Sequence, residues 1–95
     1  MAAISKTVVS IQPGKMDEAY KFLDSQSHLA SSIDGMIGFA VANTGDNELT
    51  VIGVYESTSA AESASSLVQP LFAQMASFME GTPERGVFSG VWFAG

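Results

Sequence analysis

Apolar and polar residues alternate with a period that changes several times along the chain. Residues 4–11 are mostly β-branched and stop at Pro13-Gly14, which predicts a strand followed by a turn. From residue 15 the apolar side chains recur at helical spacing, so residues 15–33 predict a helix. Asp34-Gly35 ends this pattern, and Gly35 suits the left-handed position that closes a helix.

The middle of the chain predicts a hairpin. Residues 36–42 and 48–55 are largely apolar, and both have the composition of strands. Residues 43–47, Asn-Thr-Gly-Asp-Asn, lie between them and include residue types that tolerate positive φ. The two strands are therefore expected to pair directly.

A second apolar stripe at helical spacing follows the hairpin. Its start is open, because Ser59 and Glu62 have the spacing of a capping box while Ser57 competes as the cap. Pro70 lacks a backbone donor and clashes with the preceding turn, which predicts a kink or two segments, 57–68 and 70–80.

The last strand is expected at residues 86–93, rich in valine and aromatics. The resulting order, βαββαβ, predicts an α+β fold of the ferredoxin-like type, with a four-stranded antiparallel sheet and both helices on one face. With 95 residues, the chain is expected to form a single domain, 1–95.

The strands are apolar on both of their faces, although two helices can cover only one face of the sheet. The chain is also 46% hydrophobic, more than one small core can bury. A second copy stacked on the uncovered face would bury it, so we expect a homodimer through the sheet faces, a dimeric α+β barrel.

Charge and residue usage restrict the partners. A net charge of -6 with only four Lys and Arg argues against nucleic acid and against an anionic membrane surface. The chain has no cysteine, and no apolar run approaches the ~20 residues that span a bilayer. A cytoplasmic protein is the default expectation.

Four short segments resemble the antibiotic biosynthesis monooxygenase (ABM) family, whose members are dimeric α+β barrels. These segments, spread over nearly the whole chain, are Ile11-Gln12-Pro13-Gly14-Lys15, Asp34-Gly35, Val54-Tyr55-Glu56-Ser57 and Gln69-Pro70-Leu71-Phe72. The resemblance implies binding of a small apolar or aromatic molecule. It also suggests cofactor-independent oxygenation of a phenol or quinol, or haem degradation.

The chain departs from the family pattern at residues that often carry chemistry. Leu71 and Ser66 stand where the second helix of the family often has histidines, and Gly53-Val54-Tyr55 replaces a Glu-x-Trp. Without a helix histidine to ligate iron, a haem-degrading role is not expected. No metal site and no bound cofactor are expected either.

His28, Trp92 and Tyr55 are the candidate catalytic residues. His28 is the only histidine and lies one turn after Asp24, which would orient it as a base, but a contact on a solvated helix face is the stronger explanation of the pair. Trp92 offers a ring that can stack on a ligand and an indole N–H that can donate a hydrogen bond. The alternative is that it packs in the core or the dimer interface. Tyr55 offers a phenolic donor or a core ring.

Ser10, Tyr20, Phe39 and Phe72 are the candidate ligand-binding residues, each with a packing role as the alternative. Two functions stay open. One is an ABM-like oxygenase, which an open cavity lined by at least two of Tyr20, Tyr55, Trp92 and His28 would support. The other is a non-catalytic dimeric module that binds a metabolite or a partner, having lost the active-site residues of the family.

Overall fold

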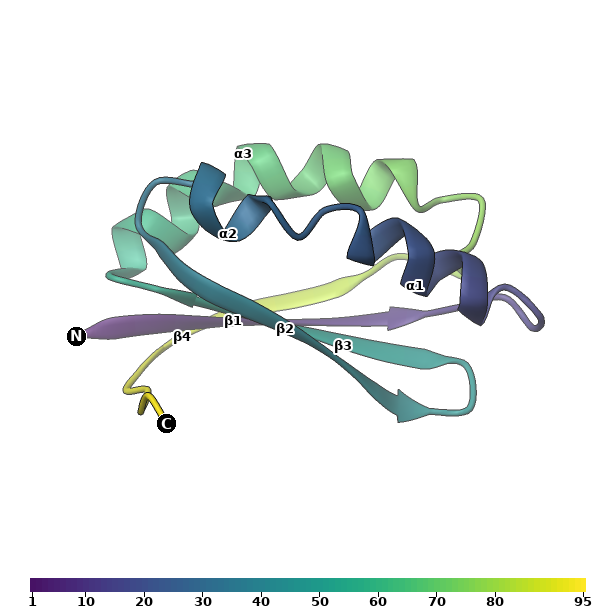
Figure 1. The fold of residues 1–95 in the computed structure, drawn as a ribbon, viewed down its shortest axis with the longest axis horizontal. Helices are drawn as coiled ribbons and strands as arrows, with labels where there is room; N and C mark the ends of the chain where they lie inside the picture. Colours follow the sequence, from purple (N-terminus) through teal and green to yellow (C-terminus); the bar gives the residue numbers. More distant parts are fainter.

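The chain alternates strands and helices in the expected order. The computed structural model describes residues 1–95 (Figure 1). Its elements are β1 (Ala2–Ser10), α1 (Met16–Asp24), α2 (Leu29–Ser32), β2 (Met36–Gly45), β3 (Glu48–Tyr55), α3 (Thr58–Gln74) and β4 (Glu84–Gly90).

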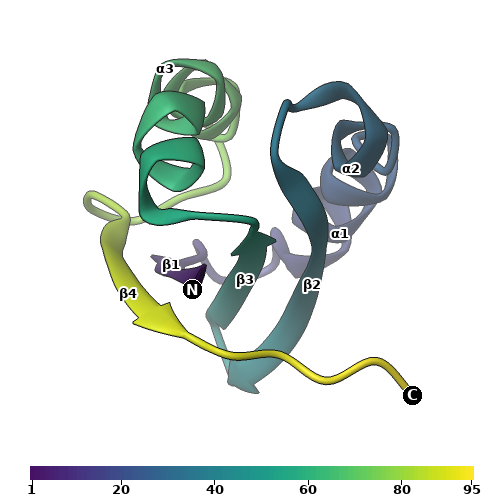
Figure 2. The same cartoon turned by 90° about the vertical axis from the view of Figure 1, so that its left-hand side faces the viewer.

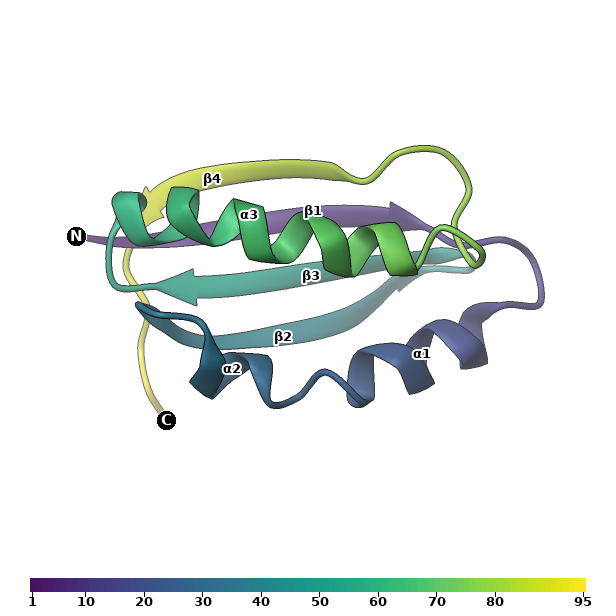
Figure 3. The ribbon, with the colours of Figure 1, turned by 90° about the horizontal axis from the view of Figure 1, so that it is seen from above.

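The four strands form one antiparallel sheet in the order β2-β3-β1-β4. All three helices cover one face, and the other face is bare (Figure 2). Seen from above, α3 lies over the β1 side of the sheet, and α1 and α2 follow β2 (Figure 3). The ferredoxin-like α+β prediction is confirmed.

The strand register decides which residues face the helices. Val41, Val51, Thr7 and Arg85 form one row across the four strands, each directly opposite the next. Val51 packs against buried residues under the helices, and both Val51 and Thr7 line a cavity there, so this row faces the helices. The neighbouring row consists of Ala40, Ile52, Lys6 and Gly86 and faces away.

Two apolar clusters fill the space between helices and sheet. The larger cluster lies between the sheet and the helices α1 and α3, toward the end of the sheet that carries the β2-β3 hairpin. Its eight buried residues are Val9, Ile11, Ala19, Leu23, Leu49, Phe72, Met75 and Met79. Five form the smaller one beneath α2 and the start of α3, namely Ala3, Ile33, Tyr55, Ala61 and Ala64. The helices are thus held by two separate contacts with the sheet.

The single helix expected at residues 15–33 is wrong. Helix α1 ends at Asp24, turns occupy residues 25–28, and α2 is a separate short helix. The break falls in a polar stretch where the hydroxyl of Ser25 donates to the carbonyl oxygen of Phe22. Such local bonds from serine to the backbone compete with helix propagation. Gly35 does adopt the expected left-handed conformation, with φ 78°.

The two segments expected around Pro70, 57–68 and 70–80, are wrong, because α3 runs as one helix from Thr58 to Gln74. Pro70 is exposed, whereas Ala64 and Phe72 on either side of it are buried. Packing on both sides therefore outweighs the lost hydrogen bond. Of the two candidate caps, Ser57 is the one used, and its Oγ accepts from the amide of Ala60 at 3.1 Å.

Strand bounds shift by a few residues, most at the C-terminus. Strand β4 begins at Glu84 and ends at Gly90, so residues 91–93 lie outside the expected strand. Figure 2 shows the last residues running from β4 past the end of the sheet on its bare side. In the hairpin, β2 extends to Gly45, and no residue of the turn has positive φ.

No helix of this structure has both the length and the apolar character needed to cross a membrane.

Candidate functional site

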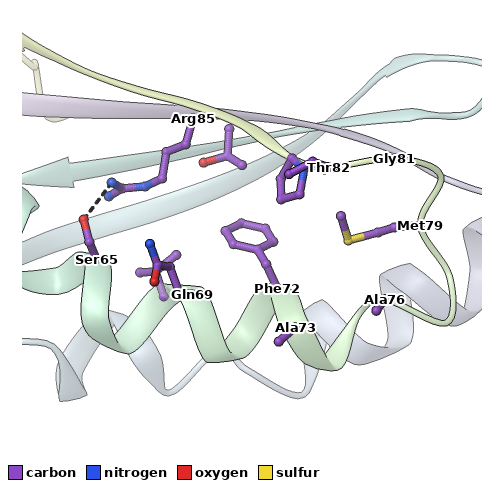
Figure 4. Close-up of a pocket in the computed structure, with 12 residues that line it drawn as sticks. Ser65, Gln69, Phe72, Ala73, Ala76, Met79, Gly81, Thr82 and Arg85 are labelled. Carbon is purple, nitrogen blue, oxygen red and sulfur yellow. Dashed lines mark hydrogen bonds between the residues drawn. The ribbon is translucent and has the colours of Figure 1, made fainter.

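A groove of about 480 Å³ lies between α3 and the start of β4 (Figure 4). Helix α3 contributes Ser65, Gln69 and Phe72 to its wall, and the segment that leads into β4 contributes Thr82 and Pro83. Phe72, Ala76 and Met79 make much of the wall apolar. The groove can therefore take up a flat apolar molecule from solvent.

A second, inner cavity of about 40 Å³ lies deeper between the helices and the centre of the sheet. Its wall includes Ser5, Phe39, Gly53 and Tyr55. The groove and the inner cavity share four lining residues, which are Thr7, Val68, Phe72 and Arg85. The two spaces are thus adjacent.

Arg85 is the only charged residue that lines either space. Its Nη1 donates a hydrogen bond to Oγ of Ser65 at 3.0 Å, as Figure 4 shows. Its Nη2 is buried without a hydrogen-bond partner, the one buried side-chain nitrogen or oxygen in this state. The N–H donors of Nη2 are therefore unused within the chain.

Tyr55 is 1% exposed, and its ring occupies the space left free by a glycine two residues earlier. A Cβ at Gly53 would lie 3.0 Å from the Tyr55 ring and 2.6 Å from Oγ of Ser5. The small residue at position 53 thus lets the aromatic ring lie against the sheet.

We expect Gly53→Ala to lower the free energy of unfolding by about 1–3 kcal/mol, because the added methyl overpacks this site. Chemical denaturation followed by circular dichroism measures the change. Gly38→Ala is the matched control, since Gly38 is also in a strand and its added Cβ meets nothing within 4 Å. A rescue variant, Gly53→Ala with Ser5→Ala, should regain part of the loss. Equal stability of the two glycine variants would contradict the prediction.

Three of the residues singled out from the sequence lie around the cavities. Tyr55, Phe39 and Phe72 all line the inner cavity, and Phe72 also lines the groove. Tyr20 lines neither space, but shares with Phe39 an outer hollow between α1 and β2. Of the four polar candidates, Tyr20, Tyr55, Trp92 and His28, only Tyr55 lines the groove or the inner cavity, so neither space has the two polar side chains expected to support an oxygenase.

His28, Trp92 and Ser10 line neither the groove nor the inner cavity. His28 is exposed at the start of α2, where its carbonyl oxygen accepts from Ser31 and Ser32. Trp92 lies beyond the end of β4 and is 44% exposed. Ser10 is exposed at the end of β1. Their roles remain predictions from the sequence.

Arg85 and Gln69 are site residues that the sequence reasoning missed. The sequence pattern could have indicated Arg85, because residues two apart in a strand lie on the same face, and Arg85 therefore shares a face with the apolar Val87. A lone arginine on the covered face of a strand is unusual unless it has a partner. No group of three or more His, Asp or Glu side chains is placed to hold a metal ion.

No protein-family model matches the sequence, and no curated protein matches it either. Solved structures do resemble the fold. NE2512 of Nitrosomonas europaea, a protein of unknown function, has a TM-score of 0.82 at 16% identity, over 99% of this chain and 96% of its own. A candidate antibiotic biosynthesis monooxygenase from the same organism has a TM-score of 0.80 at 11% identity, over 99% and 94%.

SnoaB of Streptomyces nogalater, a cofactor-independent oxygenase, has a TM-score of 0.76 at 14% identity, over 97% of this chain and 95% of its own. These similarities bear out the resemblance to the ABM family at the level of the fold. At such identities they carry no residue roles.

Proposed function

We propose that this protein binds a small, flat, largely apolar aromatic molecule in the groove between α3 and β4, and oxygenates a phenol or quinol with O₂ without a cofactor. The observation that carries the proposal is the groove itself, which is open, about 480 Å³ in volume and walled by Phe72 and Met79. Pockets of this size suit molecules of two or three fused rings. The fold shared with SnoaB supports the choice of chemistry.

In the proposed reaction the substrate is a phenol with a free ring C–H opposite its hydroxyl. One atom of O₂ becomes the second carbonyl oxygen of a quinone, the other leaves as water, and the substrate supplies all the electrons. The protein has to hold the ring, favour loss of the phenolic proton and exclude water. Tyr55, in the inner cavity next to the groove, would hydrogen-bond the substrate oxygen.

Oxygen consumption tests this function directly. We expect uptake above that of heat-inactivated protein with at least one member of a panel of phenols and 1-naphthols that carry hydrogen on the ring carbon opposite the hydroxyl. Tyr55→Phe should lower the rate by about tenfold or more, because one hydrogen bond to a charged oxygen in the transition state is lost. Trp92→Phe, run beside it, decides whether the tryptophan contributes from its position beyond β4. No uptake across the panel would count against oxygenase chemistry.

The second candidate function is a non-catalytic module that binds a ligand of the same kind. The observation in its favour is that no histidine and no carboxylate lines the groove or the inner cavity, so a conventional general base is missing there. Binding of an aromatic ligand without oxygen uptake would favour this function.

We further propose that two copies associate through their bare sheet faces. Ile4, Ile52 and Val54 lie on that face, and Phe88 is 58% exposed beside them. Apolar surface of this extent on a small chain is best explained by a covering partner. A second copy stacked about a two-fold axis covers both bare faces at once.

A further inference from the structure

The guanidinium of Arg85 lies between helices and sheet with no acidic partner. No Asp or Glu lines the groove or the inner cavity, and Glu84, the nearest acid in sequence, points to the bare face with Val8 and Gly86. Ser65 accepts one hydrogen bond from Nη1, and Nη2 has no partner. The positive charge is therefore uncompensated within the chain.

Arg85 as a whole is half-buried, but its Nη2 has lost water without gaining a hydrogen-bond partner, and that loss is costly. A methionine or leucine at position 85 would fill the same space on the covered face without that cost. The arginine thus contributes something other than stability, and a ligand that completes its bonding is the direct explanation.

We infer that the groove recognises aromatic ligands through an anionic oxygen, a carboxylate or a phenolate, which pairs with Arg85. This inference deepens the proposed function, since it names the substrate class of the same groove. Figure 4 shows Arg85 reaching down from β4 toward α3, with Gln69 next to its head and the Phe72 ring farther along the groove. An aromatic ring lying against Phe72 would place an attached anionic oxygen near the guanidinium.

The polar neighbours of Arg85 suit an anion. Ser65 holds Nη1, which orients the planar head, while Thr7 and Gln69 add a hydroxyl and an amide to the wall. Arg forms planar charge-assisted bonds with carboxylates, and such bonds are stronger where water is excluded. The net charge of -6 repels anions at long range, but dissolved salt screens this repulsion. A direct contact between an anion and the half-buried Arg85 is screened much less, so the local attraction persists.

A phenolate bound at Arg85 would also be more reactive. The positive charge stabilises the anion relative to the neutral phenol, so it lowers the pKa of the bound phenol. The titratable and charged groups around the two cavities are Arg85 and Tyr55 alone, and no carboxylate there opposes this effect. Arg85 would in this way promote the deprotonated, electron-rich form without acting as a base.

The carboxylate form is tested with 2-naphthoate and its neutral isostere 2-naphthamide, titrated without oxygen and followed by ligand fluorescence. We expect the parent protein to bind naphthoate more tightly than naphthamide by about tenfold or more. Arg85→Gln should abolish this preference and leave naphthamide affinity within about twofold. Arg85→Lys, which keeps the charge but not the planar fork, should retain part of it.

Lys21→Gln is the matched control, because it removes one positive charge from the exposed face of α1, away from both cavities. It should leave the preference unchanged. A similar loss in Lys21→Gln and Arg85→Gln would mean that net charge alone sets the preference, and would overturn the inference.

The phenolate form is tested with 1-naphthol, whose absorption spectrum distinguishes the neutral and ionised species. We expect bound naphthol to ionise at lower pH than free naphthol in the parent and not in Arg85→Gln. A preference for the anionic form in either the naphthoate or the naphthol experiment supports the inference, and it shows whether the anionic oxygen belongs to a carboxylate or to a phenolate. No preference for anion in either arm, or equal loss of anionic and neutral probes in Arg85→Gln, overturns it.

Thermal unfolding separates recognition from a structural role. Because Arg85→Gln removes a half-buried charge and its unpaired Nη2, the Tm of this variant should equal or exceed that of the parent. A clear fall in Tm together with weaker binding of both probes would show that Arg85 is structural. The binding and unfolding measurements require no catalytic turnover. They therefore test the role of Arg85 in anion binding even if the protein consumes no oxygen.

Discussion

Val51→Lys is expected to abolish the cooperative folding of this chain near room temperature. Val51 packs against the larger core cluster and lines the inner cavity, in the same sheet row as Thr7 and Arg85. A lysine there carries an unpaired charge into the core and adds a second positive charge to the inner cavity, which Arg85 already lines. A cost of about 3–5 kcal/mol is comparable with the whole stability of a small domain.

Thermal and urea unfolding followed by circular dichroism measure this loss. Val51→Ala separates packing from charge, because it removes two methyl groups and adds no polar atom, and its effect should be clearly smaller. An unfolding midpoint of Val51→Lys within a few degrees of the parent would show that this side chain does not face the helices.

Ile52→Lys, one residue further along β3, is expected to have a different outcome. Ile52 lies on the bare face between Ala40 and Lys6, so the lysine can reach water in an isolated copy, and the fold should persist. If two sheets stack there, the new charge is buried close to Lys6 and to its symmetry mate. Association should then weaken by about a hundredfold or more.

Sedimentation velocity at micromolar concentration tests this expectation, with a chain mass of 9.9 kDa as the monomer reference. Leu67→Lys is the control, because Leu67 is 57% exposed on α3, away from the sheet. The parent and Leu67→Lys should sediment as dimers and Ile52→Lys as a monomer. A parent that sediments as a monomer would refute the homodimer, and a dimeric Ile52→Lys would place the interface elsewhere.

The contrast between positions 51 and 52 illustrates what strand patterns predict. Both residues are β-branched and apolar, so the sequence shows that the strand has two apolar faces but not which one meets the helices. The structure decides this through packing, since Val51 contacts the core cluster. The β2-β3 hairpin and the strand at 48–55 needed only local signals and were predicted correctly, although β2 continues to Gly45 and the turn is shorter than the expected 43–47.

Errors in the prediction occur where local preference and packing disagree. The rule that proline interrupts a helix is local, and at Pro70 it is outweighed by buried residues on either side. In residues 25–28 the opposite holds, because polar side chains end α1 where an apolar pattern suggested continuation. Trp92 was assigned to a strand that ends at Gly90.

By itself, the sequence determined the order of elements, the ferredoxin-like sheet and the surplus of apolar strand surface, because these depend on periodicity, turns and composition. The tertiary structure alone placed Arg85 beside Ser65 and Phe72, and left its Nη2 without a partner. Whether a charged group has a counter-ion depends on residues distant in the chain, such as those on β1, α3 and β4. No pattern along a single segment records that arrangement, which is why the candidate anion site became visible only in the fold.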